Sequence, residues 1–410
     1  MKKTIDDINV RGRRVLVRLD LNVPVDDTGR ITDDRRIQAA LPSVKKLLAD
    51  AGRLILMSHL GRPDEEPQQK HKYSLKPVSQ RLTELLGKSV PLLPDCVGPE
   101  VSTRAGRMRD GDAVLLENLR FHEAETIKDK KASQNPKLRE QKDAFARELA
   151  SLADVYVNDA FGTCHRDNAS MFTVPQLMVG KPRMIGYLVQ RELKFLGETV
   201  TNPRRPFICV LGGAKVSDKL GVIRALLAKC DTILIGGAMA YTFLAADGMG
   251  VGRSLVEPDL FATARQLRAD AGAKLLLPVD SIVASAIKGG SPSNICTDSI
   301  PADKMGLDIG PETIKNYAEV LRTAKTVVWN GPMGVFEVPP FDRGTIAMAQ
   351  ALADATKNGA TTIVGGGDSA AALDKAGLAD GVTHISTGGG ASLEFLEGKP
   401  FAAIDILDDA

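Results

Sequence analysis

The sequence predicts an α/β protein with two Rossmann-like, doubly wound parallel-sheet domains joined by an interdomain helix and hinge. Short apolar runs rich in β-branched residues alternate with helical stretches along nearly the whole chain. Such alternation is typical of parallel sheets with right-handed crossovers and helices on both faces. At 410 residues the chain is also longer than one hydrophobic core usually supports, which favours two domains of similar size.

The first half of the chain contains four expected strands. They are predicted at residues 13–19, 54–58, 113–117 and 154–158, with helical stretches such as 37–50 and 138–152 between them. Residues 128–142 are rich in lysine and glutamine and have no apolar stripe before Leu138. We therefore expect this segment to be an exposed loop that runs into a helix.

The second half repeats the pattern after a proline-rich connection. Its strands are predicted to begin at Phe207 and to continue at 232–236, 274–280, 326–330, 361–365 and 384–386. Between the halves, the charged helical stretch 190–197 precedes Thr201-Asn-Pro-Arg-Arg-Pro206. The predicted organisation is a first domain at 1–184, an interdomain helix and hinge at 185–200, a second domain at 201–398, and a tail at 399–410 that could pack back on the first domain.

Composition argues against several classes of protein. The formal net charge is +2, and no lysine or arginine block lies beside aromatic residues, so we expect no nucleic-acid partner. No run approaches the roughly 18 apolar residues of a membrane span, and the first residues lack the apolar core of a secretory signal. These features predict a cytoplasmic protein without a membrane partner, and a monomer is the default expectation.

The cysteines indicate neither a disulfide framework nor a zinc site. The five cysteines are scattered, odd in number and never spaced as Cys-x-x-Cys. Cys164 stands beside His165, but neighbours in an extended chain point to opposite faces, which disfavours a thiol nucleophile.

Three glycine-rich turns in the second half each follow an apolar run and are interpreted as phosphate cradles. They are Leu211-Gly-Gly-Ala-Lys-Val-Ser-Asp-Lys219, Val364-Gly-Gly-Gly-Asp-Ser369 and Ser386-Thr-Gly-Gly-Gly-Ala-Ser392. Glycine allows the backbone to approach phosphate oxygens, and unpaired amides at a helix start point at an anion. Lys215 and Lys219 add positive charge, and Asp368 offers the hard oxygen ligand that Mg²⁺ prefers.

Polar and cationic side chains follow the expected strands of the first half. In a doubly wound sheet, ligands bind outside the carboxyl ends of the strands, so these side chains are expected to line one surface. Arginine suits such a surface because its planar fork forms paired hydrogen bonds with carboxylate and phosphate oxygens. The candidates for gripping a small anion are Asp20, Asn22, His59, Arg62, Arg120, His122 and Arg166. His59 alternatively ties down its own turn.

The motifs of other nucleotide-binding enzymes are absent from the sequence. No Gly-x-Gly-x-x-Gly follows the first strand, and there is no Gly-x-x-x-x-Gly-Lys-Ser/Thr. The chain also lacks the Asp-Phe-Gly motif that protein kinases need beside their catalytic loop. What remains is a nucleotide phosphate site of another kind, together with an anion-binding domain.

The combination of motifs resembles the phosphoglycerate kinase family over nearly the whole chain. The resemblance rests on Arg18-Leu-Asp-Leu-Asn-Val-Pro24, Ser58-His-Leu-Gly-Arg-Pro63, Glu117-Asn-Leu-Arg-Phe-His122, Asn158-Asp-Ala-Phe-Gly-Thr163 and Val328-Trp-Asn-Gly-Pro-Met-Gly-Val-Phe-Glu337, which occur in the family's order. Leu21 and Ser369 stand where the family commonly has phenylalanine and threonine, and both keep the character of the side chain.

This resemblance implies a glycolytic and gluconeogenic phosphotransferase. It would transfer a phosphoryl group reversibly between ATP and the carboxylate of 3-phosphoglycerate, giving ADP and 1,3-bisphosphoglycerate, by direct in-line transfer after domain closure. By the same likeness, the first domain would bind 3-phosphoglycerate through Asp20, Asn22, Arg36, His59, Arg62, Arg120 and Arg166. The second would bind the nucleotide through Gly213, Lys215, Lys219, Gly236, Gly237, Gly310, Asn330, Glu337, Gly366, Gly367, Asp368 and Ser369, with Mg²⁺ on Asp368.

The chemistry of that reaction fits the residue types. A carboxylate nucleophile is ionised at neutral pH, because carboxylic acids titrate near pH 4, so no general base is required. Catalysis then consists mainly of alignment and charge stabilisation. Arg36, Lys219 and the backbone at Gly366 and Gly389 are the predicted catalytic groups.

Two other functions remain open from the sequence alone. One is an α/β phosphotransferase that acts on another small acid, such as acetate or carbamate, and lacks the seven-residue anion grip. The other is a non-enzymatic, ligand-responsive scaffold that uses the same fold, although the retained lysines, arginines and Asp368 disfavour it.

Overall fold

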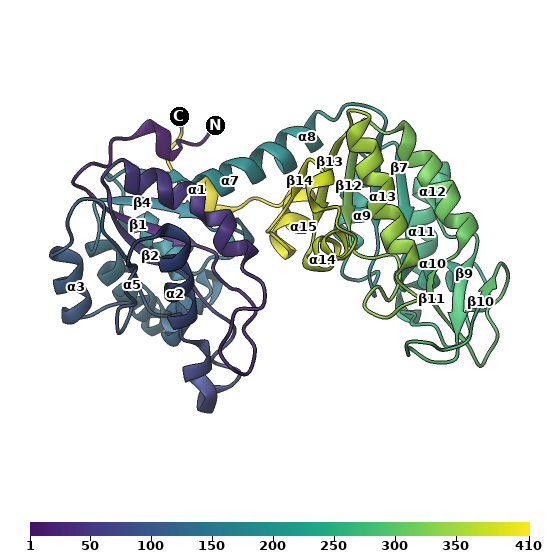
Figure 1. The fold of residues 1–410 in the computed structure, drawn as a ribbon, viewed down its shortest axis with the longest axis horizontal. Helices are drawn as coiled ribbons and strands as arrows, with labels where there is room; N and C mark the ends of the chain where they lie inside the picture. The colour runs from purple at the N-terminus through teal and green to yellow at the C-terminus, as the bar shows by residue number, and fades with distance from the viewer. The chain divides into compact units, whose positions relative to one another are not determined.

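The chain forms two compact units in the computed structural model. The structure describes residues 1–410, apart from the side chain of Glu198. One unit contains Met1–Leu193 and Pro400–Ala410, and the other contains Lys194–Lys399. Each unit is built on a parallel sheet accompanied by helices (Figure 1), so the predicted α/β fold class is confirmed.

The first unit has a five-stranded parallel sheet of order β3-β2-β1-β4-β5. Its strands are β1 (Arg14–Leu19), β2 (Arg53–Met57), β3 (Ala113–Leu115), β4 (Val155–Asp159) and β5 (Arg183–Ile185). Its helices are α1 (Arg35–Ala49), α2 (Lys76–Leu86), α3 (Pro99–Gly106), α4 (Asp129–Ala132), α5 (Pro136–Ser151), α6 (Val174–Leu177), α7 (Tyr187–Glu192) and α16 (Ala402–Asp405).

Strand β1 is central in this sheet and is buried on both faces. Val15, Val17 and Leu19 share a hydrophobic core with apolar residues of α1 and α2. The intervening side chains point the other way, because neighbours along a strand alternate between faces, and Arg18 on that face is also buried. A parallel strand covered on both sides needs an almost continuous apolar run, which the sequence RVLVRL supplies apart from Arg14 at its start and Arg18.

The second unit has a six-stranded parallel sheet of order β14-β13-β12-β6-β7-β8. Its strands are β6 (Phe207–Leu211), β7 (Thr232–Ile235), β8 (Leu275–Leu276), β12 (Thr326–Asn330), β13 (Thr361–Gly365) and β14 (His384–Ile385). Its helices are α8 (Thr199–Thr201), α9 (Leu220–Leu227), α10 (Met239–Ala246), α11 (Phe261–Ala271), α12 (Pro311–Thr323), α13 (Arg343–Lys357), α14 (Gly367–Lys375) and α15 (Gly390–Leu396).

A small antiparallel sheet in the second unit departs from the expected strict alternation. It has the order β10-β9-β11, with β9 at Ser281–Ala284, β10 at Ser293–Cys296 and β11 at Met305–Ile309. Most of β10 is exposed, so its sequence carries no apolar pattern that marks a strand. Strand β5 was also missed, because three residues are too short to show periodicity.

The polar segment 128–142 differs from the expected exposed loop. It contains the short helix α4, and α5 begins at Pro136, capped by the side chain of Asn135. The side chain of Lys142 is completely buried. The lysine-rich composition hid this arrangement because a lysine is rarely buried unless its charge is paired.

The segment between the units is helical, and the tail returns to the first unit. Helix α7 continues through a π-helical turn, η7 (Leu193–Glu198), into α8. Within unit 1, the carboxylate of Asp408 accepts from Nη2 of Arg183 at 2.7 Å and from the Arg183 amide at 2.9 Å. Among the described residues, no helix is long and apolar enough to cross a membrane.

Both parallel sheets reverse their strand order between two central strands. The reversal lies between β1 and β4 in the first unit and between β6 and β12 in the second. Crevices beyond the carboxyl ends of such strands are the usual ligand sites of doubly wound sheets. The residues that follow β1 and β4, and those that follow β6 and β12, are therefore the first places to look for a site.

Candidate active site

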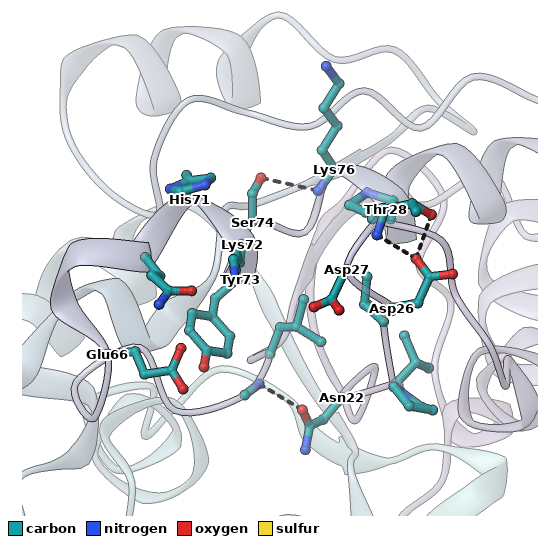
Figure 2. Close-up of a pocket in the computed structure, with 18 of the residues that line it drawn as sticks. Asn22, Asp26, Asp27, Thr28, Glu66, His71, Lys72, Tyr73, Ser74 and Lys76 are labelled. Atoms are coloured by element: carbon teal, nitrogen blue, oxygen red, sulfur yellow. Dashed lines mark hydrogen bonds between the residues drawn. The ribbon is translucent and has the colours of Figure 1, made fainter.

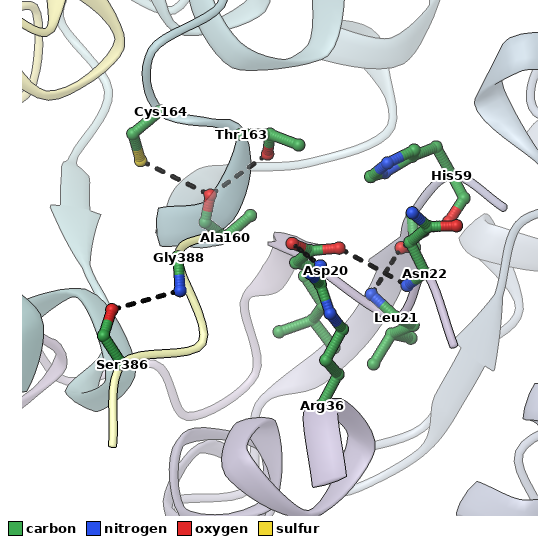
Figure 3. A network of polar contacts seen from close by, with 12 residues as sticks. Asp20, Leu21, Asn22, Arg36, His59, Ala160, Thr163, Cys164, Ser386 and Gly388 are labelled. Atoms are coloured by element: carbon green, nitrogen blue, oxygen red, sulfur yellow. Dashed lines mark hydrogen bonds and ion pairs between the residues drawn. The ribbon is translucent and has the colours of Figure 1, made fainter. Parts of the chain in front are cut away.

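The first candidate site follows the ends of β1 and β2 in unit 1. The Asp20 carboxylate forms an ion pair with Nη1 of Arg36, which lies in the first turn of α1. Asn22 accepts a hydrogen bond from the amide of Gly61 at 2.8 Å, which ties the segment after β1 to the segment after β2. Figure 3 shows Asp20, Asn22, Arg36 and His59 close to one another.

His59 lies buried at the centre of a group of arginines. Its Nδ1 is 3.1 Å from Nη2 of Arg18, another buried side chain. Burial lowers the pKa of His59 well below its ordinary value, and the charges of Arg18, Arg120, Arg166 and Arg36 lower it further. Because arginine has no acceptor, His59 Nδ1 must accept, which leaves a neutral ring with its proton on Nε2. His59 can therefore donate a hydrogen bond from Nε2.

Arg18 is supported by a buried polar chain. Its Nε donates to Ser170 Oγ at 3.0 Å, and that hydroxyl donates to Oε1 of the buried Glu125 at 2.6 Å. The Ser170 amide donates to the other oxygen of the same carboxylate at 2.9 Å. This chain fixes the guanidinium that holds His59.

Arg120 is held next to His59 by the buried side chain of Asn118. Asn118 Oδ1 accepts from the amides of Arg120 and Leu60, and its Nδ2 donates to the Leu60 carbonyl at 2.7 Å. Burial lowers the pKa of Arg120 to about 10, and the charges of Arg166 and Arg18 add to that effect. Its Nε is buried and donates to no described protein atom. An anion beside it would supply the missing acceptor.

The two remaining arginines of the predicted grip are exposed. Arg62 forms an ion pair with Glu65 at 2.8 Å, and 65% of its side chain is exposed, so the structure does not bring it into the cluster. Arg166 is exposed too, and its Nε donates to Nε2 of the neighbouring His165 at 3.2 Å. Its charge lowers the pKa values of both His59 and Arg120.

A pocket of about 1030 Å³ adjoins this cluster and is lined in part by Asn22, Arg36 and Gly61. Figure 2 shows that its other walls carry charges of both signs, including Lys72, Lys76 and Glu66. The acidic side chains of Asp26, Asp27 and Glu66 balance the basic ones of Arg36, Lys72 and Lys76. Arg36 is the arginine of the cluster that lines this pocket.

The second candidate site follows β6, β12 and β13 in unit 2. Lys219 is largely buried at the start of α9, and its Nζ donates to Oδ1 of Asn330, the last residue of β12. Burial lowers the pKa of Lys219 to about 8, although the charges of Asp218 and Asp368 oppose that shift. Lys219 and Asn330 are therefore brought together, and the charge of Asp368 acts on Lys219.

The first glycine-rich turn is not the open cradle that we expected. The amides of Gly212 and Gly213 donate to the carbonyls of Asn330 and Pro332, both at 3.0 Å. A Cβ on Gly212 would lie 2.1 Å from the Pro332 carbonyl oxygen, so glycine serves close backbone packing there. This pairing depends on a neighbouring turn that is distant in sequence, which explains why the turn alone could not reveal it.

The second glycine-rich turn is placed as an anion site requires. Gly366, at φ +93°, is the N-cap of α14, whose first-turn amides have no carbonyl of their own helix to pair with. Asp368 is exposed in this first turn, and buried Ser369 Oγ accepts from the Gly331 amide at 2.7 Å. In the third turn, Gly389, at φ +52°, is the N-cap of α15.

The other predicted nucleotide residues fall into separate places. The amides of Gly236 and Gly237 donate to the carbonyls of Leu211 and Met333 at 2.9 and 2.8 Å, so these glycines pack beside the first turn. Gly310 is the N-cap of α12 and leaves room for the carboxylate of Asp280, which accepts from the helix's amides. Lys215 and Glu337 are exposed.

Comparisons with known proteins identify the family. A sequence profile described as phosphoglycerate kinase matches residues 5–399. The chain is 53% identical to phosphoglycerate kinase of Rhodopirellula baltica and 52% identical to that of Chloroherpeton thalassium, with 100% of each chain covered in both cases.

Solved structures give the same result. The structure of phosphoglycerate kinase from Coxiella burnetii matches with a TM-score of 0.83 and 39% identity, covering 99% of this chain and 98% of that one. The chain belongs to the phosphoglycerate kinase family. The crystal structure of the enzyme from Pyrococcus horikoshii matches with a TM-score of 0.84 and 30% identity, covering 98% of both chains. The family resemblance stated from the motifs is confirmed, and the chain is a phosphotransferase that uses ATP and 3-phosphoglycerate.

Sequence reasoning missed the residues that hold the phosphoglycerate kinase site together. Asn118 lies inside the quoted Glu117–His122 motif, and Arg18 begins another, so their motifs were visible although their contacts were not. Glu125 and Ser170 stand in no motif. Their pairing joins positions 45 residues apart, which only the fold reveals.

We expect His59 to remain uncharged at pH 6.5, where an ordinary histidine is half protonated. Burial and the nearby arginines stabilise the neutral ring, and Arg18 selects the tautomer with the proton on Nε2. Nitrogen-15 NMR of the imidazoles checks both statements. A His59 signal that titrates near pH 6.5, or that carries its proton on Nδ1, would contradict this description.

Proposed function

We propose that the two sites divide the reaction of the family between them. The arginine cluster of unit 1 binds 3-phosphoglycerate, and the glycine-rich turns of unit 2, with Lys219, bind ATP. The observation that carries this proposal is the concentration of positive charge in unit 1, where the buried His59 contacts Arg18 and its pKa is lowered by the charges of four arginines. A ligand with a phosphate and a carboxylate matches such a surface, because arginine pairs with both groups.

The individual roles follow from the contacts. Arg120 would donate from its orphaned Nε, His59 would donate from Nε2, and Asn22 and Asp20 would hold the hydroxyl side of the substrate. Arg166 adds charge from its exposed loop, while Arg62 would have to leave Glu65 before it could contribute. Arg36 would approach the transferring group, since its ion pair with Asp20 already fixes it at the start of α1.

In unit 2 the nucleotide phosphates would lie against the first turn of α14. Amides at a helix N-terminus and glycine backbone suit a phosphate, and Lys219 supplies a positive charge. The further nucleotide contacts remain as the motifs imply, through Gly213, Lys215, Gly236, Gly237, Gly310, Asn330, Glu337, Gly366, Gly367 and Ser369. Glu337 would meet the ribose, and Gly236 and Gly237 would flank the adenine.

Asp368 would hold Mg²⁺ together with the nucleotide. Mg²⁺ is usually bound by one or two carboxylates plus substrate phosphates, and Asp368 is an exposed carboxylate in the turn assigned to the phosphates. The donor set therefore fits. When bound, the ion neutralises part of the charge on the phosphates.

Phosphoryl transfer here needs alignment and no proton acceptor. The substrate carboxylate is already ionised, so it attacks without a general base. Arg36, Lys219 and the amides at Gly366 and Gly389 would stabilise the charge of the transferring group. In-line attack brings the reacting atoms to about 3 to 3.5 Å, which requires the two units to close with both substrates bound. Closure also excludes the water that would hydrolyse ATP.

The remaining expectations concern assembly, location and specificity. Each proposed site is built from residues of a single chain, so we propose a monomer, and a cytoplasmic reaction in keeping with these substrates. Turnover with 3-phosphoglycerate, ATP and Mg²⁺, measured beside acetate and carbamate, tests the acceptor. Product formed only with 3-phosphoglycerate supports the proposal, and turnover of the smaller acids would contradict it.

Removing Arg36 or Lys219 should slow turnover far more than it weakens binding. Loss of one donor to the transition state costs about 3 to 4 kcal/mol, so Arg36→Ala and Lys219→Ala should each lower kcat about 100- to 1000-fold. Steady-state kinetics with separate measurements of substrate affinity check this. Arg35→Ala is the matched control, because Arg35 pairs with Asp33 at the surface. Equal losses in kcat and affinity would remove these residues from the transition state.

The rate should also fall as Lys219 loses its proton. The pKa of Lys219 is lowered to about 8, so the charged form dominates below that pH and disappears as the pH rises through it. We expect kcat/KM for ATP to decrease above pH 8, because this parameter reports the free enzyme. In Lys219→Arg the side chain stays charged, so the activity that remains should show no decrease in kcat/KM above pH 8. The same decrease above pH 8 in this variant would show that another group causes it.

A further inference from the structure

Lys142 is buried in unit 1 without any role in the sites described above. Its side chain has no exposed surface, and it lies on α5, in the polar segment that the motifs left unassigned. Its Nζ donates to Oδ1 of Asp129 at 2.8 Å and to the backbone carbonyl of Asp167 at 2.6 Å. A buried lysine is tolerated only where its charge is paired, so these contacts are essential to its position.

The same contacts hold Asp167 from two sides. The amide of Asp129 donates to the Asp167 carboxylate at 2.7 Å, while Lys142 binds the Asp167 carbonyl. Asp129 is itself braced by Nη2 of Arg139 at 3.2 Å. Both the backbone and the side chain of Asp167 are therefore attached to α4 and α5.

Asp167 directly follows Arg166, whose charge acts on two groups of the substrate cluster. The charge of Arg166 lowers the pKa values of His59 and Arg120, which shows that its guanidinium lies near other cationic groups. Like charges repel, and the exposed Arg166 side chain is held by a hydrogen bond from its Nε to Nε2 of the neighbouring His165 at 3.2 Å, so its direction depends on the backbone of this segment. On one side that backbone is fixed by the Arg166 amide, which donates to the Thr163 carbonyl at 3.0 Å. The attachment of Asp167 fixes it on the other side.

We propose that Lys142, together with Asp129, is a positioning residue that holds Arg166 against the substrate cluster. This inference rests on the proposed role of Arg166 in binding 3-phosphoglycerate. It gives the α4–α5 segment a function in substrate affinity. Lys142 does not touch the substrate and acts through the backbone of Asp167.

The variant Lys142→Met tests the proposal because it keeps the length of the side chain and removes its donors. We expect the KM for 3-phosphoglycerate to rise about 10-fold, because Arg166 would be displaced slightly from its binding position. The KM for ATP should not change. Lys137→Met is the matched control, because Lys137 is an exposed lysine on the same helix. Variants that merely reduce the folded fraction would lower the apparent kcat and leave both KM values unchanged. That result for Lys142→Met would overturn the proposal.

A double variant separates this inference from the proposed function. If Lys142 acts through Arg166, the combination with Arg166→Ala should raise the KM for 3-phosphoglycerate no further than Arg166→Ala does alone. Additive effects would refute the positioning role while leaving Arg166 in the site. An unchanged KM in Arg166→Ala would instead refute the role of Arg166 itself. Should Lys142→Met fail to fold, Asp129→Asn carries the same test, because it weakens the lysine's anchor and keeps the backbone amide.

Discussion

The crowding of positive charge around a neutral, buried histidine is the constraint on which the first site depends. Arg18 is anchored by a buried chain through Ser170 to Glu125, and from there it dictates the tautomer of His59. Arg120 is fixed by Asn118 with an unpartnered Nε. The cluster thus contains one unsatisfied donor and several like charges, and the binding of a small anion, as we propose, would relieve both. Preorganised donors of this kind need no rearrangement when the substrate binds.

The second site, in unit 2, is built mainly from backbone groups of glycine-rich turns. Adjacent turns after β6, β7 and β12 pack so closely that only glycine fits at position 212. The amides of these turns donate hydrogen bonds to backbone carbonyls of the neighbouring turns. The open amides lie one strand further on, where Gly366 begins α14. Burial lowers the pKa of Lys219 to about 8, so its charge is lost at a lower pH than that of an ordinary lysine, and a bound phosphate would favour the charged form. The first glycine-rich turn, at Gly212, therefore serves close packing, whereas the second, at Gly366, is the one we propose for anion binding.

Much of this could be predicted from the sequence, and the failures have physical causes. Alternating apolar runs predicted the two parallel sheets. Polar residues at or just after strand ends, such as Asn330 and Asp20, indicated both candidate sites because parallel strands end at the same edge of a sheet. Prediction from local sequence failed for residues whose hydrogen-bond partners are distant in the sequence. Gly213 was expected to offer a free amide, but this amide donates a hydrogen bond to the Pro332 carbonyl. Lys142 was expected in an exposed segment, but its ammonium group is buried and donates to Asp129 and Asp167. The short β10 lacked a pattern because most of it is exposed.

Calorimetric titration of the Arg120→Met variant with 3-phosphoglycerate, and separately with Mg²⁺-ADP, tests the central claim that each unit binds its own substrate. We expect the Kd for 3-phosphoglycerate to rise at least about 10-fold, since a charged hydrogen bond contributes about 1.5 to 3 kcal/mol. The Kd for Mg²⁺-ADP should stay as it is in the unmodified chain, which would also show that the variant is folded. Unchanged affinity for 3-phosphoglycerate, or an equal loss of affinity for both ligands, would contradict the account.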